Sequence, residues 1–106
     1  MKILVTFRGM EHSNALEDFV KAKLHKVLRF LENEASPTVI DVILEAGTQH
    51  HHHKVEFRLH SPHYKIVAHR EGPEIYAEVE AVADIFAQEI AKEKQKRVDD
   101  LRRRSN

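Results

Sequence analysis

Two stretches of this sequence are rich in basic side chains whose chemistry suits a polyanion. Residues 19–31 contain four Lys or Arg and no acid, and residues 92–106 contain seven Lys or Arg against three acids. Residues 71–89 carry six acids and no Lys or Arg, so this formally neutral chain is strongly polarised. Cations of this kind bind phosphates because each neutralised phosphate releases condensed counterions. Each basic stretch is therefore a candidate phosphate-binding surface.

The spacing of these cations places several of them on common helix faces. Lys23 and Lys26 are three residues apart, so they would share one face of a helix, opposite its apolar stripe. The later stretch has a similar spacing among its cations Lys92, Lys96 and Arg97, with Lys94 on a neighbouring face. If the two helices pack side by side, these groups would form one patch. The alternative is that they only offset the helix dipole and keep the surface solvated.

Four consecutive imidazoles are the second group with chemical potential: His50, His51, His52 and His53. Alternate His residues of a strand share a face, so two of them could bind Zn²⁺ or Ni²⁺. A catalytic metal centre normally has three protein ligands, and the chain has no Cys and no carboxylate motif to complete one. We therefore predict no metal site and no cofactor.

A catalytic group is the third possibility, with His12, Ser13 and Asp18 close together in the sequence. No nucleophile elbow, Walker loop or dinucleotide fingerprint accompanies them. Ser13 already has a sufficient role as the cap of the helix that follows. We expect no catalytic residues and no enzymatic activity.

Length and composition indicate one small domain, residues 1–106. Only 42% of the 106 residues are hydrophobic, which is enough for one modest core. The absence of Cys excludes disulfides and suits a reducing cytoplasm. The apolar run in residues 1–5 is too short for a signal peptide or a membrane span. We expect a cytoplasmic protein without membrane contact.

Hydrophobic periodicity predicts the elements that must position the cations. Residues 2–8 are rich in strand formers, and Ser13 or Asn14 can cap a helix whose apolar stripe runs to Leu31. Ser36-Pro37 ends that helix, and residues 38–46 form the next strand. The last third, from Glu71 onward, is predicted to be one long helix with an acidic start and a basic end.

A hairpin is predicted between these helices. If Ser61-Pro62 is its turn, paired residue numbers sum to 123, which places Val55 opposite Ala68 and Phe57 opposite Ile66. This register leaves one apolar and one polar face. The sequence therefore predicts an α+β fold of order β-α-β-β-β-α, a four-stranded sheet with two helices packed on one face.

Three segments, in their order and spacing, carry a resemblance to a known family: residues 15–26 (ALEDFVKAKLHK), 71–77 (EGPEIYA) and 90–96 (IAKEKQK). The chain resembles the short ribosome hibernation-promoting factors and the related ribosome-associated inhibitors, the sigma-54 modulation protein family. The likeness extends from Ile3 to about Leu101. The run of four His is not part of the family pattern.

The resemblance implies a ribosome-binding domain that regulates translation in stress and stationary phase. It implies binding to the 30S subunit and the 70S ribosome at 16S rRNA in the mRNA/tRNA decoding channel, which blocks translation and promotes hibernation. If the chain is a complete short form, a second modulation factor would be needed for 100S dimers. DNA is not an expected partner.

By position, the resemblance implies that Lys23, Lys26, Lys92, Lys94 and Lys96 contact RNA. Helical proximity adds two further cations, Arg29 and Arg97. Tyr76 matches a family position, and we expect it to pack in the core. The alternative function is a general module for double-stranded or structured RNA without ribosome specificity. A protein adaptor that uses the long second helix is a further alternative.

Overall fold

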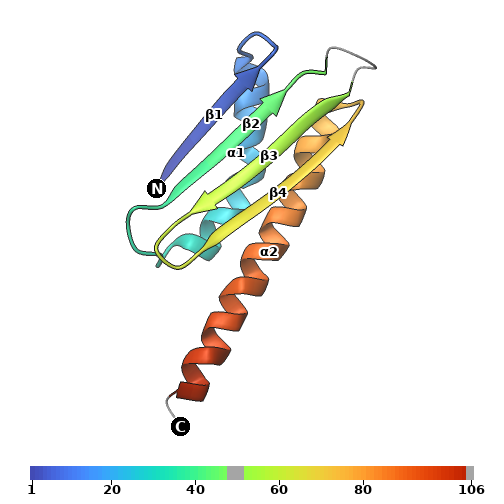
Figure 1. Cartoon of the computed structure of the whole chain (residues 1–106). Helices are drawn as coiled ribbons and strands as arrows, with labels where there is room; N and C mark the ends of the chain where they lie inside the picture. The colour runs from blue at the N-terminus through green and yellow to red at the C-terminus, as the bar shows by residue number, and fades with distance from the viewer. Residues whose placement is uncertain (48–51, 105–106) are drawn as a thin grey trace.

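The computed structural model describes residues 1–47 and 52–104 of the chain. The elements follow the order β1 (Lys2–Arg8), α1 (Asn14–Leu28), a 3₁₀ turn η1 (Arg29–Leu31), β2 (Val39–Glu45), β3 (His53–His60), β4 (Lys65–Gly72) and α2 (Ile75–Arg104). Figure 1 shows that α2 continues well past the end of the sheet.

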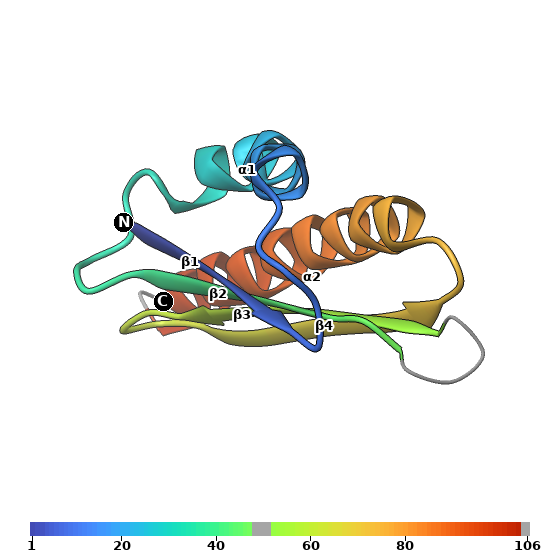
Figure 2. The ribbon, with the colours of Figure 1, turned by 90° about the horizontal axis from the view of Figure 1, so that it is seen from above.

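The strands form one four-stranded sheet in the order β1-β2-β3-β4. β1 is parallel to β2, whereas β2–β3 and β3–β4 are antiparallel. α1 follows one outer strand and α2 follows the other, and Figure 2 shows both helices on the same face of the sheet. The predicted β-α-β-β-β-α fold is confirmed.

The hairpin register differs from the prediction by two residues. Val55 lies opposite Arg70, Phe57 opposite Ala68 and Leu59 opposite Ile66, so paired numbers sum to 125 and not to 123. The loop is longer than two residues because Pro at its second position does not suit a two-residue turn. A shift of two leaves each side chain on its original face, so the predicted apolar face is correct although the register was wrong.

The core lies between this apolar face and the two helices. Fully buried side chains of β3 meet fully buried side chains of α2, and the rings of Phe57 and Phe86 pack edge to face with centroids 5.6 Å apart. α1 covers the rest of the sheet with an apolar stripe at helical spacing. Its buried members are Leu16, Val20, Leu24 and Val27.

The ends of the helices show where local signals decided the structure and where they did not. Ser13 caps α1 as predicted, since its Oγ accepts a hydrogen bond of 3.1 Å from the Leu16 amide. The prediction that α2 begins at Glu71 was wrong, because β4 continues through Gly72. The proline at position 73 favours an extended residue before it, and α2 starts at Ile75.

The junction between β4 and α2 is tightly packed around an ion pair. Arg70 Nε lies 2.9 Å from the carboxylate of Glu78, whose side chain is buried. A Cβ on Gly72 would lie 2.4 Å from that carboxylate, so a larger residue there would displace the Glu78 side chain. This junction fixes the direction in which α2 leaves the sheet.

Candidate functional site

The two helices lie side by side and run in the same direction. Near the N-terminal ends of the helices, the rings of Phe19 and Tyr76 pack edge to face, with centroids 5.0 Å apart. Further along, Lys23 lies beside Glu80, and near the end of α1 the Lys94 ammonium donates a 3.1 Å hydrogen bond to the Phe30 carbonyl. The two basic stretches therefore lie on the same side of the sheet, because both helices cover that one face (Figure 2).

Two cations of α1, Lys23 and Lys26, form ion pairs with acids of α2. Lys23 Nζ lies 3.2 Å from the Glu80 carboxylate, and Lys26 donates a hydrogen bond to Asp84. The Lys26 hydrogen bond and charge, with a smaller contribution from Lys23, lower the pKa of Asp84. The acid-free character of residues 19–31 thus has a structural explanation, because the missing acids come from the neighbouring helix.

The cations of α2 beyond Ile90 have a different environment. Within the described residues, no ion pair involves Lys92 or Arg97, and Lys96 has only a partner on its own helix, Glu93, at 3.4 Å. Both Lys92 and Arg97 are exposed. These side chains are accessible to a partner in a way that Lys23 and Lys26 are not.

The turn η1 brings further cations to this region. Arg29 is exposed on η1, and the hydrogen bond from Lys94 to the carbonyl of Phe30 ties the two segments together. Arg97 and Lys94 line the same hollow as Phe30. Lys94 and Arg97 therefore lie together beside Phe30, which unites part of the predicted patch, whereas Arg29 does not line this hollow.

Two neighbouring hollows separate the β3–β4 turn from α2. One, of about 220 Å³, is lined by the turn residues His63 and Tyr64 and by α2 side chains that include Lys96, Arg97 and Arg104. The second, of about 180 Å³, shares His63, Tyr64 and Arg97 with the first. The turn residues gave no signal in the sequence, because nothing local links a hairpin turn to the far end of the following helix.

A buried carboxylate anchors that turn. The Glu34 side chain is only 5% exposed, and it accepts hydrogen bonds from the Ser61 hydroxyl, from the His63 amide at 3.1 Å and from His63 Nδ1 at 2.7 Å. Burial alone would raise the pKa of Glu34, but these bonds and one from the Ala35 amide lower it from 4.5 to about 2. The carboxylate is therefore ionised at neutral pH, and it holds the turn in place.

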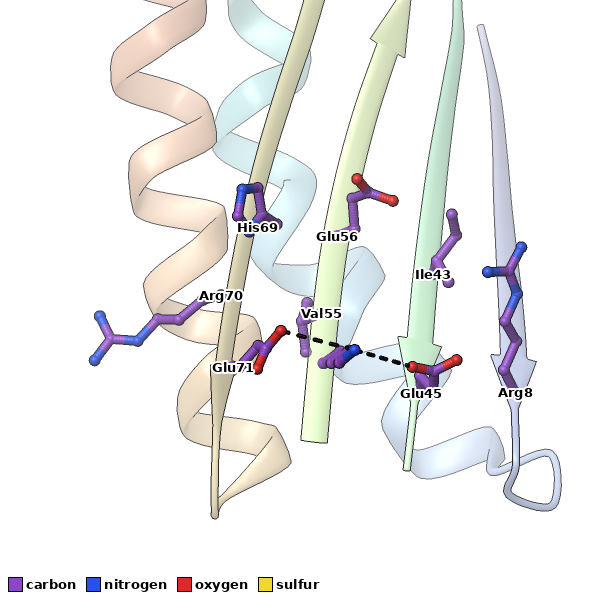
Figure 3. A pocket seen from close by; sticks show the side chains of 9 residues that line it. Arg8, Ile43, Glu45, Val55, Glu56, His69, Arg70 and Glu71 are labelled. Carbon is purple, nitrogen blue, oxygen red and sulfur yellow. Dashed lines mark ion pairs between the residues drawn. The ribbon is translucent and has the colours of Figure 1, made fainter. Parts of the chain in front are cut away.

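The open face of the sheet also has a hollow, of about 240 Å³, at the end of β1, β2 and β4 and the start of β3. Figure 3 shows its charged side chains alternating in sign across the strands. Lys54 Nζ lies 4.0 Å from Glu45 and 3.8 Å from Glu71. Because acids surround this cation, the hollow suits a polyanion less well than the helical face does.

Two sequence predictions can be compared with the structure here. Tyr76 is 46% exposed and touches Phe19 at the helix surface, so its predicted core position was wrong. Of the His run, His50 and His51 lie outside the described residues, and His52 is 3.2 Å from Glu71. Among residues 1–47 and 52–104, no group of three or more metal-ligating side chains is close enough to hold an ion.

The same two ranges contain no helix with the length and apolar character that a membrane span requires. The long helix α2 is instead amphipathic, with acids and bases along its outer face.

The fold and this surface define a class of protein: a small α+β domain with two helices on one face of its sheet, one of which projects past the sheet and carries exposed cations there. Comparison with known proteins gives the family. The family model described as Sigma 54 modulation protein / S30EA ribosomal protein matches residues 3–98. The chain belongs to this family, as the sequence resemblance implied.

A curated relative and two solved structures agree with this assignment. The ribosome hibernation promoting factor of Azotobacter vinelandii is 26% identical over 99 residues, which cover 93% of this chain and 88% of that protein. A ribosomal subunit interface protein from Coxiella burnetii has the same fold, with a TM-score of 0.76, 22% identity, and coverage of 90% of this chain and 99% of that one.

The Thermus thermophilus Protein Y N-terminal domain also shares the fold, with a TM-score of 0.70 and 19% identity over 87% of this chain and 98% of that chain. The family and its relatives support a ribosome-associated function in hibernation and translation regulation. The chain is thus a non-enzymatic member of a ribosome-associated family.

Proposed function

We propose that the chain binds the small ribosomal subunit at 16S rRNA in the mRNA/tRNA decoding channel, where it blocks translation and promotes hibernation. The observation that carries this proposal is the projecting half of α2, whose cations extend beyond the sheet (Figure 1). A helix of 30 residues is roughly 45 Å long at 1.5 Å per residue. This length lets one end of α2 enter an RNA-lined channel while the sheet remains at its mouth.

The environments of the seven candidate cations predict that they contribute unequally to RNA binding. Lys92, Arg97 and Arg29 have no ion pair within the described residues, so they can meet phosphates without first losing a partner. Lys23 and Lys26 must give up their ion pairs with Glu80 and Asp84 before they can contact phosphates. Losing these pairs offsets much of the free energy that the phosphate contacts contribute to binding. Lys94 and Lys96 are intermediate, because each has one local partner.

Recognition of this kind depends on phosphates, 2′-hydroxyls and shape, as is usual for structured RNA. A formally neutral chain can bind a polyanion in this way because its charge is distributed unevenly: residues 91–104 hold seven Lys or Arg against three acids. A protein that acts on ribosomes in this way works in the cytoplasm. A second modulation factor that takes part in forming 100S dimers is a further proposed partner.

The alternative is a module for double-stranded or structured RNA without ribosome specificity. It would use the same cations but would bind naked duplex RNA as tightly as it binds 30S particles. A competition experiment between the two ligands separates the alternatives.

The direct test is co-sedimentation with purified 30S and 70S particles at two salt concentrations. The variant Arg29→Glu/Lys92→Glu reverses two free cations at the helical face. Lys2→Glu/Lys65→Glu makes the same change in charge at exposed positions of β1 and β4 and serves as the matched control.

The wild type and the control should travel with 30S particles at low salt, and the helical variant should remain at the top of the gradient. Equal loss of binding in both variants would mean that only net charge matters. If the wild type itself fails to bind at low salt, the proposed function is wrong.

A further inference from the structure

We infer that the groove between the β3–β4 turn and the end of α2 holds one unpaired nucleotide of the bound RNA. This hairpin groove is formed by the two adjoining hollows of about 220 and 180 Å³ that share His63, Tyr64 and Arg97. The inference rests on the proposed function and adds a specific site to it, built from turn residues outside the predicted cationic set.

The size of the groove favours a small ligand group. Each hollow is smaller than the roughly 300–1,000 Å³ that a drug-sized ligand occupies. Because the groove is recessed between a turn and a helix, the regular backbone of a duplex cannot enter it. A single nucleotide that is unstacked from its neighbours can enter the groove.

The lining has the composition that single-stranded nucleic acids require. Rings line one side, contributed by Tyr64 and His63 from the turn and by Phe30 from η1. Cations of α2 line the other side: Lys94, Lys96, Arg97 and Arg104. A base can stack on a ring while its phosphate contacts the cations, and this combination is general among single-strand binders.

The acids of the groove do not cancel these cations. Glu34 already accepts hydrogen bonds from Ser61, His63 and Ala35 and is buried, so little of its charge faces the groove. Glu93 is engaged by Lys96 at 3.4 Å. Only Asp100 lines the groove without an ion pair among the described residues, so an excess of positive charge remains for a phosphate.

The groove is also held in shape before any ligand arrives. The Ser61 amide donates a 3.0 Å bond to the Tyr64 carbonyl, and the Tyr64 amide donates one of 3.1 Å to the Ser61 hydroxyl. Glu34 fixes this turn to the segment after η1, and Lys94 fixes η1 to α2. Since both walls are anchored, binding a base orders few additional side chains and loses little entropy.

Tyr64 is the residue that tests the inference. We would measure 30S affinity and chemical protection of 16S rRNA for the wild type, Tyr64→Ala and Tyr64→Phe. Loss of the stacking ring should weaken binding about 5- to 100-fold, whereas Tyr64→Phe keeps the ring and should bind like the wild type. In Tyr64→Ala one unpaired nucleotide should lose its protection while the protections due to the helices remain.

Tyr64 is half-buried, so a thermal melt must show that the alanine variant is folded. Arg97→Gln/Arg104→Gln removes the proposed phosphate contacts from exposed positions, and it should lose protection of the same nucleotide. Unchanged affinity and an unchanged footprint in both Tyr64→Ala and Arg97→Gln/Arg104→Gln would overturn the inference.

A second ligand separates this inference from the proposed function. If the wild type does not bind 30S particles, a ten-residue single-stranded oligouridylate still tests the groove, and Tyr64→Ala must bind it more weakly. Equal binding of that RNA by both proteins would overturn the groove assignment. So would displacement of the RNA by an equal concentration of polyglutamate, because the occupant would then be an acidic peptide.

Discussion

The two halves of α2 belong to one continuous helix but have opposite relations to the rest of the molecule. Residues 75–90 contain all the buried residues of the described helix, and two of their acids, Glu80 and Asp84, pair with cations of α1. Residues 91–104 extend beyond the sheet, and their cations face solvent or the hairpin groove. The first half therefore anchors the helix, and the second half is available to a partner.

The comparison shows that charge along a sequence does not by itself mark a binding surface. Lys23 and Lys92 have the same side chain, but Lys23 is paired with Glu80 and Lys92 has no partner among the described residues. The same cation can contribute to the fold or to binding, and the neighbouring helix decides which.

The largest expected effect is on stability, from a change in the anchored half. Phe86 is fully buried against Phe57, so Phe86→Ala should lower the free energy of unfolding by about 3–5 kcal/mol in urea denaturation. The matched change in the projecting half is Leu101→Ala, at a side chain that is 50% exposed. This variant should change the free energy of unfolding by less than about 0.5 kcal/mol. Similar losses of unfolding free energy in the two variants would contradict the division of α2 into an anchored half and a projecting half.

The anchor of the hairpin groove should give a pH-dependent effect. The pKa of Glu34 is about 2 in the folded chain against 4.5 for the free side chain, so its ionised form stabilises the fold above pH 4.5. This stabilisation decreases as the pH falls from 4.5 to about 2. Glu34→Gln should therefore be less stable than the wild type by at most about 3 kcal/mol at pH 7.

Unfolding curves at pH 7, 4 and 2 check this expectation, and the difference between the two proteins should shrink toward pH 2. Glu32→Gln, at an exposed position two residues away, is the matched control and should have little effect at any pH. A constant difference for Glu34→Gln across the range would show that its charge does not matter.

The projecting half should determine how ribosome binding depends on salt. Lys92→Gln removes one free cation, so the slope of log K against log salt should become shallower by roughly 0.7–0.9 for one lost phosphate contact. Filter binding to 30S particles at four salt concentrations measures this slope. Lys23→Gln should change it less, because Lys23 already has Glu80 as a partner. Equal changes would mean that the paired cation also contacts phosphate.

The smallest effect is expected from the exposed ion pairs between the helices. Glu80→Gln removes the partner of Lys23 at a side chain that is mostly exposed, so it should cost no more than about 0.5 kcal/mol. Glu89→Gln, on the same helix and without an ion pair in the described ranges, is the control. Glu80→Gln should also raise the affinity for 30S particles slightly, since it frees Lys23 for a phosphate. Weaker binding would contradict the view that Glu80 competes with phosphate for Lys23.

Much of the fold could be predicted from local patterns. Alternation in β3 and β4 identified the buried face, and the Ser13 cap and the apolar stripe located α1. The register of the hairpin was predicted wrongly: Pro62 argues locally for a longer loop, but the turn is also held by Glu34, which contacts it from 27 or more residues away.

The candidate site could be predicted only in part. The seven cations were identified from charge and resemblance, and their role in RNA binding stays a prediction. Tyr76 was assigned to the core because aromatic residues are often buried, but its position at the helix surface leaves it 46% exposed. The groove residues had no local signal at all.

The sequence by itself determined the elements, their buried faces and the family, because these depend on periodicity, caps and motif order within short segments. Tertiary structure alone decided which cations are neutralised and which remain free. It also decided that a turn, η1 and the end of α2 enclose a groove. Those properties arise from distances between segments far apart in the chain, and such distances are set by packing and not by local sequence.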